Sequence, residues 1–174
     1  MSTVGRINFE PVSDILQVHR RDFPLADPTL ADPTNAVALI DGEWMVLNSS
    51  YQIARAAAIA TPGTAATLRS FPVFAEQGRY DVQAIADRKT VVLYLGEYEF
   101  DTRVFDAAAT VGGGAPITTV LQTLKVATVT IGTRNFIGLV GHGGASDTDP
   151  IQGYVTRLPA DNGGKLRFIS GDRK

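Results

Sequence analysis

The stretch Ile151-Gln-Gly-Tyr-Val-Thr-Arg-Leu-Pro-Ala-Asp-Asn-Gly-Gly-Lys-Leu-Arg-Phe-Ile169 is the most informative part of the chain for its fold. Two short runs that contain apolar residues flank a cluster of turn-forming residues, which is the pattern of a β-hairpin. The residues that provide the bend are Pro159, Asp161, Asn162, Gly163 and Gly164. The apolar residues available for a core are Val155, Leu166 and Phe168. The pattern is typical of a scaffold and not of a reaction centre.

Short candidate strands separated by turn residues precede this hairpin. From Leu68 onward we expect strands at 68–75, 80–86, 90–95, 98–105, 117–120, 124–131 and 136–140. In the run 98–104 apolar and charged residues alternate, which is typical of a half-buried antiparallel strand. Its two faces are Tyr98, Phe100 and Val104 on one side, and Glu99, Asp101 and Arg103 on the other.

The regular spacing of these runs, with few helical patterns, predicts an all-β fold, a small antiparallel β-barrel or sandwich. We favour the barrel because closure removes exposed edge strands. Further upstream, residues 36–40 and 43–47 predict a hairpin around the two-residue turn Asp41-Gly42. Residues 52–60 contain five alanines and are compatible with either helix or strand.

The N-terminal segment has a different composition. The pentapeptide Leu-Ala-Asp-Pro-Thr occurs twice in tandem, at 25–29 and 30–34, directly after Pro24. Three prolines in ten residues exclude a helix interior and favour extended chain. We therefore divide the chain into an extended N-terminal arm, residues 1–35, and a β-barrel domain, residues 36–174. The arm either reaches a neighbouring subunit or lies on its own domain, and residues 13–21 are compatible with one short helical turn.

Composition narrows the classes of function. With 174 residues, 44% of them hydrophobic and 20% charged, the chain can form one domain with a sizeable core. Its net charge of −2 argues against nucleic acid as a partner, and the absence of cysteine excludes disulfides and zinc–thiolate sites. No apolar run is long enough for a membrane span and the start lacks a secretion signal, so we expect synthesis in the cytoplasm and no membrane partner.

Two glycine-rich motifs could carry chemistry. Gly141-His-Gly-Gly144 is similar to the oxyanion loop of some esterases, but the chain has no Gly-x-Ser-x-Gly elbow and only His19 would remain as the base. Gly112-Gly-Gly114 precedes Ala115-Pro116 and not a helix, so it does not match a phosphate-binding loop. We interpret the first motif as a mobile surface turn and the second as a loop between strands.

Metal sites are equally weakly indicated. The aspartates that could supply calcium ligands are Asp27, Asp32, Asp147 and Asp149, and none matches the twelve-residue calcium loop. We interpret them as solvated turn carboxylates, and the two histidines are far apart in sequence. The sequence thus predicts no catalytic residue, no cofactor and no metal.

Trp44 is the single tryptophan, and it could be a sugar-stacking surface or a buried residue of the core or of a subunit contact. We favour burial. The candidate assembly contacts are Phe23, Leu25, Leu30 and Trp44.

Four segments together resemble the capsid decoration, or cement, proteins of tailed bacteriophages. They are Asp41-Gly-Glu-Trp-Met-Val-Leu-Asn48, the strand pair 91–105, the glycine-rich loop that leads into 115–120, and residues 153–157 with 164–169. The resemblance covers most of residues 36–169. It implies a virion protein without enzymatic activity or cofactor, often a homotrimer, that is made in the host cytoplasm. Its partner would be the major capsid protein, on the outer surface of the head, and the near-neutral charge fits that location.

Two other functions stay open from the residues alone. One is a tail-tube or baseplate β-barrel that stacks in rings. The other is a carbohydrate-binding β module with the stacking rings Trp44, Tyr51, Tyr80 and Tyr98. An enzyme is the least favoured class, because the chain lacks a paired acid and base with a recognisable spacing.

Overall fold

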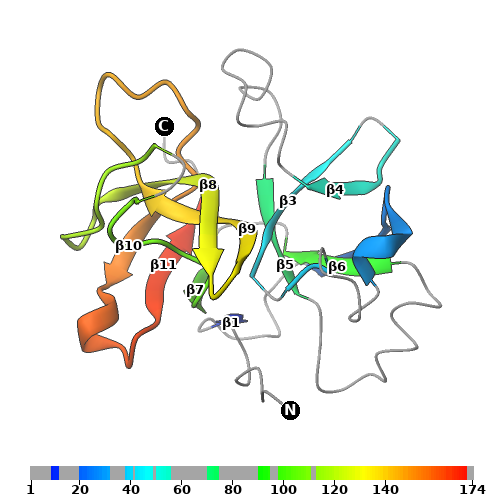
Figure 1. Cartoon of the computed structure of the whole chain (residues 1–174), viewed down its shortest axis with the longest axis horizontal. Coiled ribbons are helices and arrows are strands. Elements are labelled where there is room, and N and C mark those ends of the chain that lie inside the picture. The colour runs from blue at the N-terminus through cyan, green and yellow to red at the C-terminus, as the bar shows by residue number, and fades with distance from the viewer. Residues whose placement is uncertain are drawn as a thin grey trace.

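The fold is all-β and antiparallel, as the sequence predicts. It is seen in a computed structural model of the chain that describes residues 9–11, 20–31, 38–40, 42–48, 50–55, 70–74, 90–94, 98–110 and 113–171. Figure 1 shows two antiparallel sheets next to each other. The helical segments in the described ranges are two 3-10 turns, η2 (Pro28–Ala31) and η5 (Pro159–Asp161). Among these described residues we find no candidate for a membrane-spanning helix.

The first sheet has six strands in the order β1-β7-β11-β10-β8-β9. Their bounds are β1 (Phe9–Pro11), β7 (Glu99–Thr102), β11 (Leu166–Ser170), β10 (Gly153–Arg157), β8 (Thr123–Ile131) and β9 (Arg134–Gly141). The C-terminal hairpin of β10 and β11 is confirmed, with η5 and the following turn as its bend. Its apolar residues Val155, Leu166 and Phe168 are fully buried.

The first sheet curls back on itself, because β9 at one edge meets the chain that directly follows β7. The Leu139 N–H donates to the Val104 carbonyl at 3.0 Å, and the Asp106 N–H donates to the Leu139 carbonyl at 2.9 Å. Phe105 and Leu139 accordingly form a parallel bridge. These bonds give the sheet a barrel-like form and occupy the edge of β9 that would otherwise stay open.

Gly138 makes this closure sterically feasible. A Cβ atom at this position would lie 2.5 Å from the Val104 carbonyl oxygen and 2.6 Å from a methyl group of Val129. Any side chain would therefore push β9 away from residues 104–106, so the closure depends on a glycine at this place in the strand.

The second sheet has five strands in the order β2-β6-β5-β3-β4. Their bounds are β2 (Arg20–Pro24), β6 (Thr90–Tyr94), β5 (Ser70–Phe74), β3 (Trp44–Leu47) and β4 (Ile53–Arg55). Its strand β3 lies next to β9 (Figure 1). The Trp44 and Phe168 rings lie 6.0 Å apart, and Trp44 and Val46 belong to the same buried cluster as Phe100 and Leu124 of the first sheet. The two sheets thus share one core.

A buried ion pair reinforces the contact between the sheets. The Glu43 carboxylate is fully buried and accepts hydrogen bonds from Arg55 Nε at 2.9 Å and Arg55 Nη2 at 3.2 Å. The same carboxylate accepts a hydrogen bond from the Ile137 N–H of β9 at 3.3 Å. One carboxylate therefore connects β4 of the second sheet with β9 of the first.

Two predicted strands are wrong. Residues 38–40 form no strand, although the turn after them exists, since the Glu43 N–H donates to the Ile40 carbonyl. The Ala38 carbonyl is bound by Arg134 Nη2 at 2.7 Å, and β3 pairs with β4 and β5 instead. Residues 117–120 form a loop that is fixed by side-chain hydrogen bonds.

Other sequence predictions agree with the structure or fall outside it. The strands expected at 68–75, 90–95, 98–105, 124–131 and 136–140 correspond to β5, β6, β7, β8 and β9. The ambiguous stretch 52–60 begins with strand β4. The predicted strand 80–86, residues 13–19 of the predicted helical turn, and residues 32–34 of the repeat lie outside the described residues. The last two residues of that predicted turn, Arg20 and Arg21, belong to strand β2.

The described parts of the N-terminal 35 residues contribute an edge strand to each of the two sheets. Strand β1 pairs with β7, and β2 pairs with β6. Leu25 forms a parallel bridge with Ile53, and the Leu39 N–H donates to the Leu30 carbonyl. These parts lie on the same chain's own domain, which is one of the two placements considered for the arm.

We expect Gly138→Ala to destabilise the fold by about 1–3 kcal/mol, because the added methyl group collides with backbone that cannot move without opening the closure. Urea denaturation would measure the change. Gly132→Asn is the matched control, since Gly132 lies in the β8–β9 turn with open space around it and left-handed backbone, which asparagine tolerates. Equal stability of Gly138→Ala and wild type would contradict the role given to Gly138.

We expect Arg55→Met to destabilise the fold by about 3 kcal/mol, because it leaves the buried Glu43 carboxylate without its cation. The double variant Glu43→Gln/Arg55→Met should recover part of that loss, since a neutral amide oxygen can still accept from the Ile137 N–H. A double-mutant cycle by chemical denaturation measures both. A double variant less stable than Arg55→Met would contradict the assignment.

Candidate functional site

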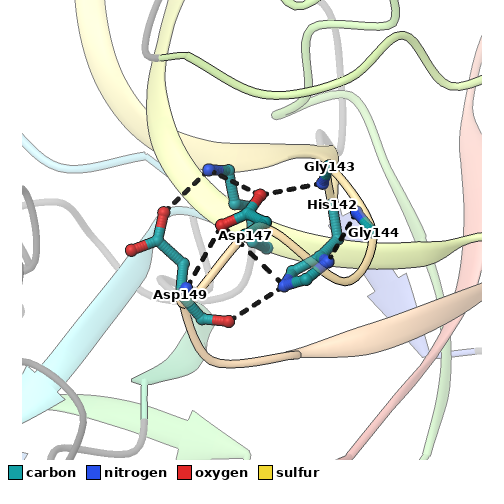
Figure 2. Close-up of polar contacts among 6 residues, drawn as sticks. His142, Gly143, Gly144, Asp147 and Asp149 are labelled. Carbon is teal, nitrogen blue, oxygen red and sulfur yellow. Dashed lines mark hydrogen bonds and ion pairs between the residues drawn. The ribbon is translucent and has the colours of Figure 1, made fainter.

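A cluster of charged and polar side chains lies where the loop 142–152 leaves β9. Figure 2 shows how the loop residues His142, Asp147 and Asp149 gather, and the two aspartates form ion pairs with Lys125 of β8. Leu124 and Val126 face the core, so the alternation of the strand directs Lys125 to the opposite face, where the loop covers it. The Lys125 side chain is only 5% exposed.

Lys125 lies between two carboxylates of the loop. Its Nζ atom is 2.7 Å from Asp149 Oδ2 and 2.9 Å from Asp147 Oδ2. Burial by itself lowers the pKa of Lys125, but its hydrogen bonds to Asp149 and Asp147 outweigh burial and raise the pKa above its usual value. The amine therefore stays protonated and is not available as a nucleophile.

Asp147 organises the loop around it. Its Oδ2 atom accepts from the Gly143 N–H at 2.8 Å, and its Oδ1 atom accepts from the Asp149 N–H at 3.2 Å. Burial by itself raises the pKa of Asp147, but the hydrogen bond from Gly143 and the ion pair with Lys125 outweigh burial and lower the pKa to about 2.

His142 completes the cluster, and both of its ring nitrogens are occupied by the loop's own backbone. The Gly144 N–H donates to Nδ1 at 3.2 Å, so Nε2 carries the hydrogen and donates to the Asp149 carbonyl at 3.0 Å. His142 Nε2 also lies 3.9 Å from Asp147 Oδ1. With both nitrogens engaged, the ring holds the loop and is not placed to act as a general base.

These four side chains, Lys125, His142, Asp147 and Asp149, form what we call the loop clamp. An open depression beside the clamp is lined by Thr123, Ala145 and Ile151 together with clamp residues. The Lys125 ammonium lies between the carboxylates of Asp147 and Asp149, where a metal ion bound by both carboxylates would have to lie. The clamp can fix the loop to the barrel, and in this arrangement it offers neither a free base nor a nucleophile.

The clamp corrects the sequence analysis at two points. Asp147 is only 11% exposed and is ion-paired, so the interpretation of a solvated turn carboxylate is wrong for it. The turn at 141–144, expected to be a mobile surface turn, is bound by two hydrogen bonds, from the Gly143 N–H to Asp147 and from the Gly144 N–H to His142. Asp27 does cap a turn, accepting from the Thr29 N–H at 2.9 Å.

Metal ligation has little support in the described residues. No group of three or more His, Cys, Asp or Glu side chains there could hold a metal ion. Asp32, His19 and Gly112, which entered the sequence analysis as candidate residues, lie outside the described part of the chain.

The four candidate assembly contacts are covered by the chain's own residues. Their exposed fractions are small: Phe23 7%, Leu25 4%, Leu30 6% and Trp44 1%. The predicted burial of Trp44 is confirmed, and the indole is therefore not a surface on which a sugar could stack. A contact with a second molecule through any of these four side chains would require the fold to open first.

The large apolar side chains that the described residues do expose lie elsewhere. They are Tyr51, 71% exposed, Val120, 51%, and Leu121, 74%. Val120 and Leu121 belong to residues 116–122, which we call the apolar tip and which directly precede β8. Tyr51 lies in the turn between β3 and β4, which belong to the second sheet.

Three sets of contacts fix the backbone of the apolar tip: hydrogen bonds of the Gln122 side chain, a hydrogen bond to β10, and the close approach of Ala115 to β9. Gln122 Oε1 accepts from the Thr118 N–H at 2.9 Å, and Gln122 Nε2 donates to the Pro116 carbonyl at 2.7 Å. The Leu121 N–H donates to the Val155 carbonyl at 2.7 Å. Gly141 lets the chain approach closely, since a Cβ there would lie 2.4 Å from the Ala115 carbonyl oxygen.

Sequence reasoning assigned part of the tip to a strand and did not single out its exposed residues. A signal was nevertheless present, because residues 107–124 contain no charged residue in a chain that is 20% charged. For the clamp, the sequence signal is Lys125, which stands between the core residues Leu124 and Val126. A lysine buried in such a strand requires a negative charge beside it.

Comparisons of the chain with models of protein families, with curated proteins and with solved structures found no match.

We expect Asp147→Asn to cost about 2 kcal/mol of folding stability at neutral pH, from the lowered pKa of Asp147. The folded-state pKa lies below the ordinary value of 3.8, so the contribution is present above pH 4 and is lost as the pH falls toward 2. Urea denaturation at a series of pH values should therefore show the wild type and the variant converging in acid. A difference that stays constant from pH 7 to pH 2 would contradict this account.

Proposed function

We propose that this chain is a capsid decoration, or cement, protein of a tailed bacteriophage, which binds the outer surface of the head and stabilises the major capsid lattice. The resemblance of its sequence to that family motivates the proposal. The structural observation that carries it is the use of buried charged side chains as cross-links between segments far apart in the chain. Such cross-links suit a protein whose role is mechanical.

Three buried charges serve in this way. Glu43 connects β4 with β9, and Lys125 connects β8 with the loop before β10. Asp101 of β7 binds Arg167 of β11 through two hydrogen bonds, at 2.7 and 2.9 Å, and also accepts from Asn162 in the bend of the C-terminal hairpin at 2.8 Å. Removing one partner of such a pair is costly, so the loops are held in one arrangement.

This rigidity supports the proposed mode of action. A cement protein resists the expansion of a shell under internal pressure, and a stiff body transmits force between the subunits that it bridges. Each copy needs only a modest contact, because many copies act together on a repeating lattice. The major capsid protein is the proposed partner, a homotrimer the proposed assembly, and the exterior of the virion the proposed location.

The direct test mixes the purified chain with expanded shells of its virus that lack it. We expect saturable binding at a fixed number of copies per shell and a higher temperature of shell disruption, measured by sedimentation and by calorimetry. Unexpanded shells are the control for surface specificity. Binding to no expansion state would contradict the proposal, and rings or tubes formed by the isolated protein in the electron microscope would favour a tail-tube protein instead.

A further inference from the structure

The backbone of the apolar tip holds an exposed side chain in an unfavourable conformation. Leu121 has φ 65°, in the left-handed region that residues other than glycine rarely adopt, and its side chain is 74% exposed. The core does not require a leucine there, since the side chain belongs to neither buried cluster found in the described residues. Strain and exposure alone do not distinguish Leu121, because Tyr51 combines φ 57° with a side chain that is 71% exposed. What distinguishes Leu121 is its position within residues 107–124, which contain no charged residue.

The surroundings of the tip define the chemistry of what it can bind. The neighbouring loop 107–110 is attached to the tip through the Ile117 N–H, which donates to the Ala107 carbonyl at 2.7 Å. Neither this loop nor the tip contains a charged residue, and Thr118 and Thr119 beside Val120 are exposed. The centres of protein interfaces are similarly depleted of charge, so the matching surface is an uncharged, apolar hollow of another protein.

The small size of the tip limits the kind of partner. A stable complex of two proteins buries about 800 Å² on each side. Two large apolar side chains expose much less than this, so the tip is insufficient to hold a second copy of the chain by itself. It is sufficient where many copies bind a repeating surface at once.

We infer that the apolar tip, through Val120 and Leu121, is the element with which the chain docks into an uncharged apolar hollow of the capsid lattice. This inference rests on the proposed function and adds the binding element to it. The Gln122 hydrogen bonds hold the tip in the docking conformation before contact, so little conformational freedom is lost on binding.

The test uses substitutions that remove the side chain and suit the backbone. Leu121→Gly and Leu121→Asn both tolerate left-handed backbone, so thermal unfolding should show stability equal to or above that of the wild type. Binding to expanded shells should become at least tenfold weaker for both. Tyr51→Gly is the matched control, because Tyr51 also has left-handed backbone, φ 57°, and a large exposed side chain, and it lies in the β3–β4 turn of the second sheet. Its binding should stay within about twofold of the wild type.

The outcomes separate the inference from the function on which it rests. If the wild type does not bind shells, the proposed function is wrong. If the wild type binds and both Leu121 variants bind equally well, the function stands and the inference is overturned. If Tyr51→Gly and Leu121→Gly weaken binding to expanded shells equally, the inference is also overturned, because binding would then depend on any exposed apolar side chain and not on the tip. Dissociation of an oligomer by Leu121→Gly with unchanged shell binding would place a second copy at the tip, against the inference.

Discussion

The backbone contact between residues 104–106 and Leu139 is the constraint on which the rest of the structure depends. It closes the first sheet at β9, the strand to which both the clamp loop and the tip are connected. The loop of the clamp leaves the end of β9 at His142, and the tip is attached to the same end through the Ala115 bridge to Gly141. Because β9 also receives the Glu43 carboxylate through the Ile137 N–H, the second sheet is held by the same strand. Opening the closure would therefore loosen the clamp, the tip and the contact between the sheets together.

The buried charges of this fold are better explained by their selecting one arrangement of strands and loops than by a gain in the free energy of folding. Taking a carboxylate and a cation out of water costs several kcal/mol per ion, and an apolar pair of the same size is often as stable. The charges instead select one arrangement among similar ones. Asp101 shows this: burial by itself raises its pKa, while the hydrogen bonds from Arg167 and Asn162 outweigh burial and lower the pKa overall. Those bonds form only when β7, β11 and the bend are in their observed register. A slip of one residue would bury that charge without a partner.

Local chemistry in the sequence predicted local structure well. The hairpin of β10 and β11 could be recognised because its turn residues and its apolar positions lie within twenty residues of each other. The hairpin expected at 36–47 has an equally good local signal, yet the Ala38 carbonyl bonds to Arg134, which is remote in sequence. The clamp could not be predicted for the same reason: Lys125 and Asp149 are ordinary charged residues until the topology of β8 and the loop brings them together. The closure at Gly138 is likewise a long-range contact, and the glycine itself resembles any glycine in a strand.

The tip and the clamp, both connected to the end of β9, are fixed by hydrogen bonds but differ in the side chains that they leave exposed. In the clamp, polar groups satisfy one another, so this loop offers a partner few unpaired donors or acceptors. In the tip, the Gln122 side chain satisfies the backbone, and the apolar side chains are left uncovered. Burying an apolar group gains free energy wherever it occurs, so a fold selected for stability alone would turn Leu121 inward or replace it with glycine. Tyr51 bears the same cost in backbone energy, so the proposed cover by another molecule rests on what Leu121 has in addition, an exposed apolar neighbour in Val120 and a stretch, residues 107–124, without any charge.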